Sequence, residues 1–383
     1  MKVVAAIDSF KGSMTSSEAG QAAREGVLRV FPSAQVVVMP VADGGEGTVE
    51  VLTDGLCGTY RTVTVTGPLG APVTCRYGVL PDGKTAVMDM AAAALTLVPD
   101  EKRNPLNTTT YGVGEMMADA LTRGCRRILL GIGGSATNDG GIGMLQALGF
   151  DVVDREGDPV PLGAKGLLKL AAIRDGREHK GLRDCEIIVA CDVRNPLCGA
   201  EGCSAVFAPQ KGASPDMVAE MDRWMRHYAT VAKDAVPTAD PEAAGAGAAG
   251  GMGFALSTFL KARLQNGIDL VLKEIGLEEA LRDADVVITG EGRLDGQTAM
   301  GKAPVGVARI AKRYRLPVLA FGGGVTAEAA SCHDAGIDAL FPIVRGVCTL
   351  SEAMDNQAAQ QHMTAAVEEA FRLLAAFKKD IKL

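Results

Sequence analysis

The sequence predicts an α/β protein in which a doubly wound parallel sheet is interrupted by a second domain. Two observations predict the sheet. Apolar, β-branched runs alternate with a helical pattern over residues 1–41, and the same alternation returns over residues 285–379. A third observation predicts the second domain, because the middle of the chain has short alternating strands around Gly and Pro turns.

The opening elements predict a strand, a helix and a second strand. Val3–Ile7 is a short apolar run that stops at Asp8, which is typical of a buried parallel strand. Thr15–Glu18 matches the capping box that begins a helix, and small or apolar residues follow at helical spacing as far as Val30. Gln35–Val41 is the next buried strand.

The C-terminal third repeats this order. Strands are predicted over 285–289, 317–321 and 339–344, and helices over 304–314, 327–335 and from about 351 to 379. Because both ends of the chain follow one pattern, we expect them to share one discontinuous domain.

The middle of the chain is organised differently. Alternating strands over 60–66, 73–79 and 85–90 predict an antiparallel meander. An apolar strand over 127–132, a helix over 141–148, a strand over 186–191 and a helix from Ser214 to about Ala232 follow, and residues 235–253 are either a linker or a ligand loop. We predict that residues 1–60 and 266–383 form one domain and that residues 61–265 form the inserted domain. Residues 100–150 are compatible with either domain.

Composition excludes several classes of protein. The net charge of −7 and the lack of basic runs argue against nucleic-acid binding, and 4% aromatic residues argue against stacking platforms. No stretch of 18 apolar residues exists, and the apolar N-terminal run is too short for a signal peptide. The nine cysteines form no C-x-x-C pair, so we expect a reduced cytoplasmic protein.

Polar loops follow the first two predicted strands. The loop over residues 8–13 carries Lys11 between two serines where parallel strands present ligands, although it also fits a polar turn with a helix cap. The loop over residues 40–48 carries Asp43 and Glu46 among glycines. This spacing suits a shared metal or ligand, and equally the acidic first turn of a helix.

Two glycine-rich loops predict phosphate binding. Gly131–Gly141 holds five glycines with Ser, Thr, Asn and Asp between a strand and a helix, a pattern that cradles anions. Gly296–Lys302 matches G-x-x-x-x-G-K, but Ala303 replaces the Mg²⁺-binding Ser or Thr, so a true P-loop is not predicted. Asp192 and Asn195 follow another strand, and Lys211 precedes a helix.

The residue types that remain favour phosphoryl transfer. The four histidines lie in polar stretches away from the acidic loops, which disfavours a zinc site or a histidine-based triad. No G-x-S-x-G elbow is present. Phosphoryl transfer depends mainly on positioning and charge neutralisation, which Asp, Glu, Lys, Arg and glycine loops supply.

Eight segments of the sequence together resemble the glycerate kinase family of the bacterial glycerate 2-kinase type. The resemblance runs from residue 1 to about 345, and the segments follow one another in the same order as in that family. The segments are DSFKGS (8–13), PVADGGEGT (40–48), NPLNTTTYG (104–112), GGSATNDGGIG (133–143), CDVRNPL (191–197), VFAPQKGA (206–213), GAGAAGGMG (245–253) and ITGEGRLDGQTAMGK (288–302). Departures are small: residues 90–95 lack a Ser often seen there, and Ala208 replaces a more usual Gly.

The resemblance implies ATP- and Mg²⁺-dependent phosphorylation of D-glycerate to 2-phosphoglycerate and ADP. It also implies a discontinuous flavodoxin-like domain, an inserted mixed-sheet domain resembling restriction enzymes, and a substrate cleft between them. A metal-dependent phosphohydrolase, a kinase that forms 3-phosphoglycerate and a non-catalytic anion binder remain alternatives. We expect small-molecule substrates, no nucleic-acid or membrane partner, and either a monomer or a homodimer.

The candidate site residues fall into three groups. The catalytic candidates are Asp8, Lys11, Asp192, Arg293 and Asp295. The candidates for substrate or phosphate binding are Ser9, Ser13, Gly133, Gly134, Ser135, Thr137, Asn138, Asp139, Asn195, Lys211, Gly247, Gly250 and Lys302. The metal candidates are Asp43 and Glu46.

Overall fold

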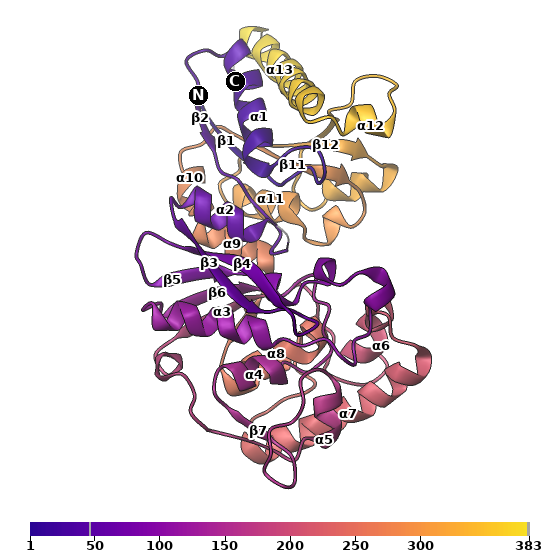
Figure 1. Ribbon diagram of the computed structural model, residues 1–383. Coiled ribbons are helices and arrows are strands. Elements are labelled where there is room, and N and C mark those ends of the chain that lie inside the picture. Colours follow the sequence, from indigo (N-terminus) through magenta and orange to yellow (C-terminus); the bar gives the residue numbers. More distant parts are fainter. Residues whose placement is uncertain (46, 381–383) are drawn as a thin grey trace. The chain divides into compact units, whose positions relative to one another are not determined.

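The computed structural model describes residues 1–45 and 47–380 and divides into two compact units (Figure 1). Unit 1 comprises residues 1–43 and the chain from Ile268 onward, and unit 2 comprises Gly44–Gly267. These boundaries differ from the sequence expectation of 60/61 and 265/266. Helix α2 (Thr48–Gly55) accounts for most of the difference, because it packs against strands β4 and β5 of unit 2.

Unit 1 is built on a five-stranded parallel sheet. Its strands are β1 (Lys2–Ile7), β2 (Gln35–Val38), β11 (Val286–Leu294), β12 (Val318–Val325) and β13 (Ala339–Pro342). The order β13-β12-β11-β1-β2 is the flavodoxin-like order, so the predicted doubly wound domain is confirmed. The chain winds one way from β1 to β2 and the other way from β11 to β13, which places the topological switch point between β1 and β11.

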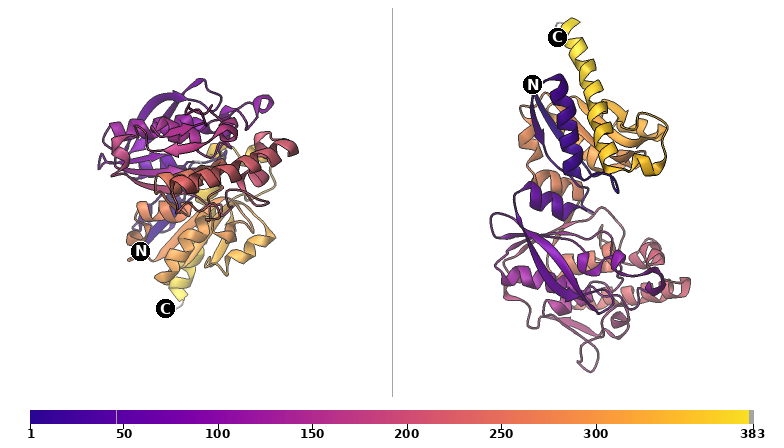
Figure 2. Two further views of the ribbon diagram at one scale, coloured as in Figure 1. Left: turned by 90° about the horizontal axis from the view of Figure 1, so that it is seen from below. Right: turned by 45° about the horizontal axis from the view of Figure 1, so that its top comes forward.

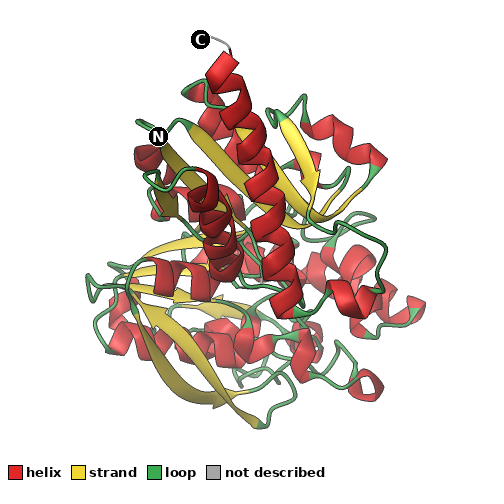
Figure 3. Ribbon diagram, turned by 90° about the horizontal axis from the view of Figure 1, so that it is seen from above, coloured by secondary structure: helices red, strands yellow, loops and turns green. Residues whose placement is uncertain are grey.

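Helices cover both faces of this sheet because the strands are apolar on both sides. Val3, Ala5 and Ile7 pack toward α1 (Ser16–Val30) and α13 (Asn356–Asp380). Val4 and Ala6 pack on the opposite side, toward α9 (Gly267–Glu274), α10 (Leu277–Leu281) and α11 (Ala303–Arg313). The yellow α13 lies beside the indigo α1 in Figure 2. In Figure 3, where helices are red, α13 is the long helix that ends next to the C label.

Local signals explain where the helices of unit 1 begin and end. The predicted capping box is confirmed, since Thr15 and Glu18 bond reciprocally at the start of α1. A second capping box at Thr349 starts α12 (Leu350–Ala353), so the predicted helix over 351–379 is two helices rather than one. The predicted helix over 327–335 is a 3₁₀ helix, η7 (Ala327–Cys332).

Unit 2 contains a six-stranded mixed sheet in the order β10-β9-β6-β5-β4-β3. Its strands are β3 (Thr59–Thr66), β4 (Pro72–Val79), β5 (Thr85–Met88), β6 (Arg127–Gly131), β9 (Glu186–Ala190) and β10 (Arg263–Gln265). The predicted meander is confirmed, because β3, β4 and β5 pair antiparallel. The other pairs are parallel, so the loops after β5, β6 and β9 share one edge.

The helices of unit 2 enclose a large apolar core. They include α3 (Tyr111–Thr122), α4 (Ile142–Ala147), α5 (Lys165–Lys169), α6 (Cys203–Phe207), α7 (Pro215–Ala235) and α8 (Ala248–Phe259), and β7 (Asp151–Val153) pairs with β8 (Ala172–Arg174). Residues 235–253 lie wholly in unit 2, which rules out a linker between the two units. Among the described residues, no helix is both long and apolar enough to span a membrane.

Candidate functional site

Asp8 stands at the carboxyl end of β1, beside the switch point of the unit 1 sheet. Its backbone N–H donates to the carbonyl of Gly290 over 2.9 Å, which fixes it against β11. Its carboxylate is 7% exposed and accepts the Ser9 N–H at Oδ1 over 2.6 Å. Ligands of open α/β sheets bind at such a switch point, so Asp8 lies where the fold favours chemistry.

The surroundings of Asp8 make its carboxyl group weakly acidic. Burial raises the pKa of Asp8 to about 7, the hydrogen bond from Ser9 opposes that rise, and the charges of Asp43 and Glu291 add to it. Lys11 acts in the opposite direction. Three carboxylates from β1, β11 and the loop after β2 therefore influence one another, with Lys11 as a nearby cation.

Glu291 is a buried carboxylate that the sequence analysis did not select. It is 8% exposed, accepts the Thr298 hydroxyl at Oε1 over 2.5 Å, and lies 3.8 Å from the Lys302 ammonium at Oε2. Burial raises the pKa of Glu291, against the effects of Thr298 and Lys302. In the sequence, Glu291 could be recognised because it follows the apolar run 286–288 of β11 after two residues, much as Asp8 follows the apolar residues of β1.

The loop after β11 places two more predicted residues close together. Asp295 accepts the Gln297 N–H over 2.9 Å, and the Arg293 guanidinium lies 3.4 Å from its other oxygen. The Arg293 side chain is 70% exposed, so it remains accessible to a ligand. Lys302 precedes the first turn of α11 and reaches back to Glu291.

The loop after β1 is a tight turn that presents Lys11 to solvent. Phe10 and Met14 pair across the turn, and Gly12 has a φ of +78°, a conformation that favours glycine. Lys11 is exposed and Ser9 is half-buried. At the start of α1, the predicted Thr15–Glu18 capping box bonds the N–H groups of Glu18 and Thr15. Lys11 stays the predicted anion contact of this loop.

In unit 2 the glycine-rich loop after β6 divides into an exposed part and a buried part. Gly133 and Gly134 are exposed, and no atom lies within 4 Å of the position that a Gly134 side chain would take. Ser135 is 7% exposed and accepts the Lys211 ammonium over 2.9 Å. Only the exposed part of the loop offers its backbone to a ligand.

The buried part of this loop corrects three predicted ligand contacts. The side chains of Thr137, Asn138 and Asp139 are fully buried. Asp139 accepts the N–H groups of Thr110 and Gly141 over 2.8 and 3.1 Å, and Asn138 donates to the Ser204 hydroxyl over 2.9 Å. Asn138 and Asp139 hold the loop to neighbouring elements inside unit 2, whereas the buried Thr137 hydroxyl has no hydrogen-bond partner among the residues that the structure describes.

Lys211 is also an internal anchor rather than a phosphate contact. It is 3% exposed and donates to the Ser135 hydroxyl and to the Thr137 carbonyl over 2.9 and 2.6 Å. Burial lowers the pKa of Lys211 to about 8. The ammonium group therefore holds the glycine-rich loop through hydrogen bonds from the interior of unit 2.

Gly247 and Gly250 are glycines because backbones meet there. A Cβ at Gly247 would lie 2.2 Å from the Pro196 carbonyl, and one at Gly250 would lie 2.1 Å from the Thr137 carbonyl. Gly250 accepts the Gly140 N–H over 2.9 Å, so two glycine-rich segments pack against each other. Close packing is enough to explain both glycines, and phosphate binding at Gly247 and Gly250 stays a prediction.

Three polar residues follow parallel strands at the same edge of the unit 2 sheet. Asp192 is exposed, and its Oδ1 accepts from the Asn266 side chain and the Gly267 N–H over 2.7 and 2.9 Å. Asn195 donates to the Glu201 carbonyl over 2.8 Å. Asp89, which the sequence analysis missed, follows β5, and burial raises its pKa.

The predicted metal pair is only partly described. Asp43 is half-buried and contributes to the electrostatics of Asp8, whereas Glu46 lies outside the described residues. Within residues 1–45 and 47–380, no three His, Cys, Asp or Glu side chains are grouped to hold a metal ion by themselves.

Comparisons with known proteins agree with the resemblance seen in the sequence. The glycerate kinase of Bacillus subtilis (strain 168) is 48% identical over 95% of this chain and 96% of its own. The glycerate 2-kinase of Escherichia coli (strain K12) is 49% identical over 92% of this chain and 93% of its own. A crystal structure from Salmonella typhimurium LT2, assigned as a glycerate kinase 2, matches with a TM-score of 0.91, 44% identity and 99% coverage of both chains. A family model described as the glycerate kinase family matches residues 3–375, and the chain therefore belongs to the glycerate kinase family.

Proposed function

We propose that this protein transfers the γ-phosphoryl group of ATP to the 2-hydroxyl of D-glycerate, giving 2-phosphoglycerate and ADP. Membership of the family supports a kinase, and the names of the Escherichia coli and Salmonella relatives support transfer to the 2-position. The reaction places a carboxylate, a hydroxyl and a polyphosphate in one site, which calls for cations and a base.

The observation that carries the proposal is the buried Asp8 carboxylate with its pKa raised to about 7. A general base works best when its pKa lies near the working pH, because it is then both available and basic enough. In the proposed step, the 2-hydroxyl oxygen attacks the γ-phosphorus, its proton passes to Asp8, and ADP leaves with the bond electrons. The Ser9 N–H holds Oδ1, which orients the carboxylate.

The acidic side chains around Asp8 fit a magnesium ion that arrives with the nucleotide. Mg²⁺ prefers oxygen ligands, and in kinases it is held by one or two carboxylates together with substrate phosphates. Asp43 and Glu291 are the carboxylates that would hold it, and their mutual repulsion with Asp8 would be relieved by a cation. When bound, Mg²⁺ neutralises the phosphate charge during transfer.

Cations for the anionic groups are available at the same edge of unit 1. Lys11 and Arg293 are exposed and suit the glycerate carboxylate or the transferring phosphoryl group. Lys302, near Glu291 at the start of α11, is a further candidate for a phosphate. In unit 2, the exposed backbone at Gly133 and Gly134 and the side chain of Asp192 remain candidates for substrate contact.

One experiment tests both the reaction and its regiochemistry. The protein is incubated with ATP, Mg²⁺ and D-glycerate, ADP release is followed, and the product is identified by ³¹P and ¹³C NMR. We expect ADP release that depends strictly on D-glycerate and a phosphate on C2. A phosphate on C3 would show the alternative kinase, and glycerate-independent phosphate release would show a phosphohydrolase.

A further inference from the structure

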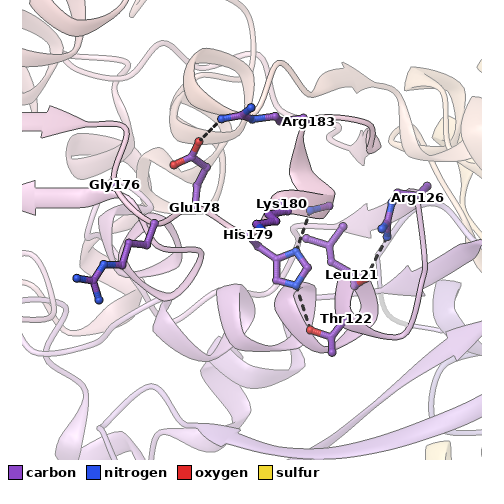
Figure 4. A pocket seen from close by; sticks show the side chains of 10 residues that line it. Leu121, Thr122, Arg126, Gly176, Glu178, His179, Lys180 and Arg183 are labelled. Carbon is purple, nitrogen blue, oxygen red and sulfur yellow. Dashed lines mark hydrogen bonds and ion pairs between the residues drawn. The ribbon is translucent and has the colours of Figure 1, made fainter.

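Unit 2 has a cavity that is unrelated to the loops described above. It has a volume of about 720 Å³ and lies between the C-terminal end of α3 and the loop over residues 176–183 (Figure 4). Its lining includes Thr122 and Arg126 from the α3 side, and Arg177, His179, Lys180 and Arg183 from the loop. We call this the amino-edge cavity.

The amino-edge cavity and the glycine-rich loop belong to opposite edges of one sheet. Arg126 immediately precedes β6, and the loop over 176–183 leads into β9. The strands β6 and β9 are parallel, so both enter the sheet from this side. The loop at Gly133 and the loop at Asp192 follow the other ends of the same strands. The cavity is therefore separate from the unit 2 candidates for substrate binding.

Its walls are held by an ordered set of hydrogen bonds. His179 Nδ1 accepts the Gly181 N–H over 3.1 Å, and because that N–H can only donate, the neutral ring carries its proton on Nε2. Nε2 then donates to the Thr122 hydroxyl over 3.0 Å (Figure 4). The Thr122 hydroxyl in turn donates to the Ala118 carbonyl over 2.8 Å. His179 thus joins the loop to the end of α3.

The backbone secures the loop from a second side. The N–H groups of Arg177 and His179 donate to the carbonyls of Gly149 and Leu148 over 2.8 and 2.9 Å. Gly149 has a φ of +95°, and a Cβ there would lie 2.4 Å from the Arg177 carbonyl. The loop is consequently fixed at two places before any ligand is present.

The lining carries more positive charge than the protein neutralises. Arg126 is committed, since it donates to the carbonyls of Leu121 and Cys125 over 3.0 and 2.7 Å. Arg183 pairs with Glu178, the one acidic lining residue, over 3.3 Å. Within the described part of the chain, no ion pair or side-chain hydrogen bond is found for Arg177 or Lys180, and both are exposed.

We propose that the amino-edge cavity is a binding site for a small phosphorylated anion, distinct from the site of phosphoryl transfer. Arg177 and Lys180 would contact the phosphate oxygens directly, with Arg183 as a further donor. A guanidinium fork and an ammonium group together match the several oxygens and the double charge of a phosphate group better than a single carboxylate. A cavity of this volume admits a ligand of nucleotide or sugar-phosphate size.

The test uses the full-length chain and inorganic pyrophosphate without Mg²⁺. Hydrogen exchange of residues 176–183 is followed by mass spectrometry, and affinity is measured by calorimetry. We expect pyrophosphate to slow exchange in this segment. The R177Q/K180Q variant should lose that protection and bind at this site about tenfold or more weakly. Both side chains are exposed, so the variant should melt as the unaltered protein does.

Three comparisons make the outcome decisive. Lys169→Gln removes an exposed lysine of α5 that is outside the cavity, and should leave the protection intact. Lys11→Met alters unit 1, and protection of residues 176–183 should persist. Malonate carries carboxylates without phosphate and should protect weakly. Unchanged exchange in this segment, equal protection in R177Q/K180Q, or equal protection by malonate would overturn the proposal.

Discussion

The N–H of Asp8 donates to the carbonyl of Gly290 over 2.9 Å, and this bond continues the parallel ladder that aligns the end of β1 with the middle of β11. Strand β11 continues to Leu294, so Glu291 follows directly beside Asp8. Two buried carboxylates from segments 283 residues apart therefore meet at the switch point of one sheet.

Asp8→Asn should separate catalysis from folding. Asn keeps an Oδ1 that can accept the Ser9 N–H, but it cannot take the hydroxyl proton, so we expect kcat to fall roughly 10²–10⁴-fold. For the unaltered enzyme, kcat/KM should rise with pH through about 7, as Asp8 loses its proton. Steady-state kinetics from pH 5 to pH 9 measures both, with Asp334→Asn, an exposed residue of unit 1, as control.

Asp8→Asn should be more stable than the unaltered protein at alkaline pH. Because the pKa of Asp8 is raised in the folded state, the folded protein binds this proton more tightly than the unfolded chain between about pH 4 and pH 7. This group therefore lowers the free energy of unfolding as pH rises through that window. Asp8→Asn should recover roughly 2–4 kcal/mol at pH 8, measured by urea unfolding. A variant less stable than the parent at pH 8 would contradict the assigned pKa.

Lys11→Met should impair turnover without disturbing the fold. Lys11 is exposed on the turn after β1, and the loss of a charge-assisted contact to a phosphate or carboxylate should lower kcat/KM by about 100-fold or more. Lys273→Met, on the exposed side of α9, is the matched control and should keep normal kinetics. Near-normal kinetics for Lys11→Met would make Lys11 an ordinary turn residue.

Alanine should destabilise the protein more at one glycine of unit 2 than at another. At Gly250 a Cβ would meet the Thr137 carbonyl at 2.1 Å, so Gly250→Ala should cost about 3 kcal/mol or more of stability. At Gly134, where φ is +72° and the space is open, alanine should cost roughly 1–2 kcal/mol. Thermal unfolding measures the difference. If Gly134 approaches a phosphate, KM for ATP should rise in Gly134→Ala.

Lys211→Met should loosen the glycine-rich loop. Without the ammonium, the Ser135 hydroxyl and the Thr137 carbonyl lose a donor, and hydrogen exchange across residues 131–141 should accelerate. Because the pKa of Lys211 falls to about 8, the unfolded chain binds more protons between about pH 8 and pH 10.5, and stability rises with pH there. That rise should disappear in the variant. Unchanged exchange would exclude the anchoring role.

Chelation should stop turnover without melting the protein. We expect EDTA to abolish ADP formation, because the phosphate charges must be neutralised during transfer. In the absence of nucleotide, we expect Tm to change by less than about 1 °C, because within residues 1–45 and 47–380 no three His, Cys, Asp or Glu side chains are grouped to hold a structural ion. Calorimetric scans with and without EDTA check this, and a large fall in Tm would mean that a metal holds the fold.

The sequence was most informative where strands are buried on both faces. Val3–Ile7 has no alternation, and such a run fits only a sheet that helices cover on both sides. The acidic residue that ends it, Asp8, was identifiable for the same reason. Helix α2 was assigned to the wrong unit because a short amphipathic helix does not indicate which sheet its buried face meets.

Glycine-rich loops were the least informative. Glycines that face open space, as at Gly134, and glycines that allow backbones to touch, as at Gly250, have the same letter in the sequence. Asp139 resembles a ligand residue until its partners, Thr110 and Gly141, are known, because a carboxylate that accepts several N–H groups is satisfied internally. Only the tertiary contacts separate these cases.

Because unit 1 is built from both ends of the sequence, its strands cannot all pair while the nascent chain is being synthesised. Strand β1 is made first, yet its partner β11 begins only at Val286, and the contact between Ala22 and Thr364 waits longer still. During synthesis, unit 2 can complete all six strands of its sheet while the apolar strand β1 still lacks a neighbour on one side. An unpaired apolar strand is prone to aggregate, so β1 is an exposed edge until the last third of the chain is made.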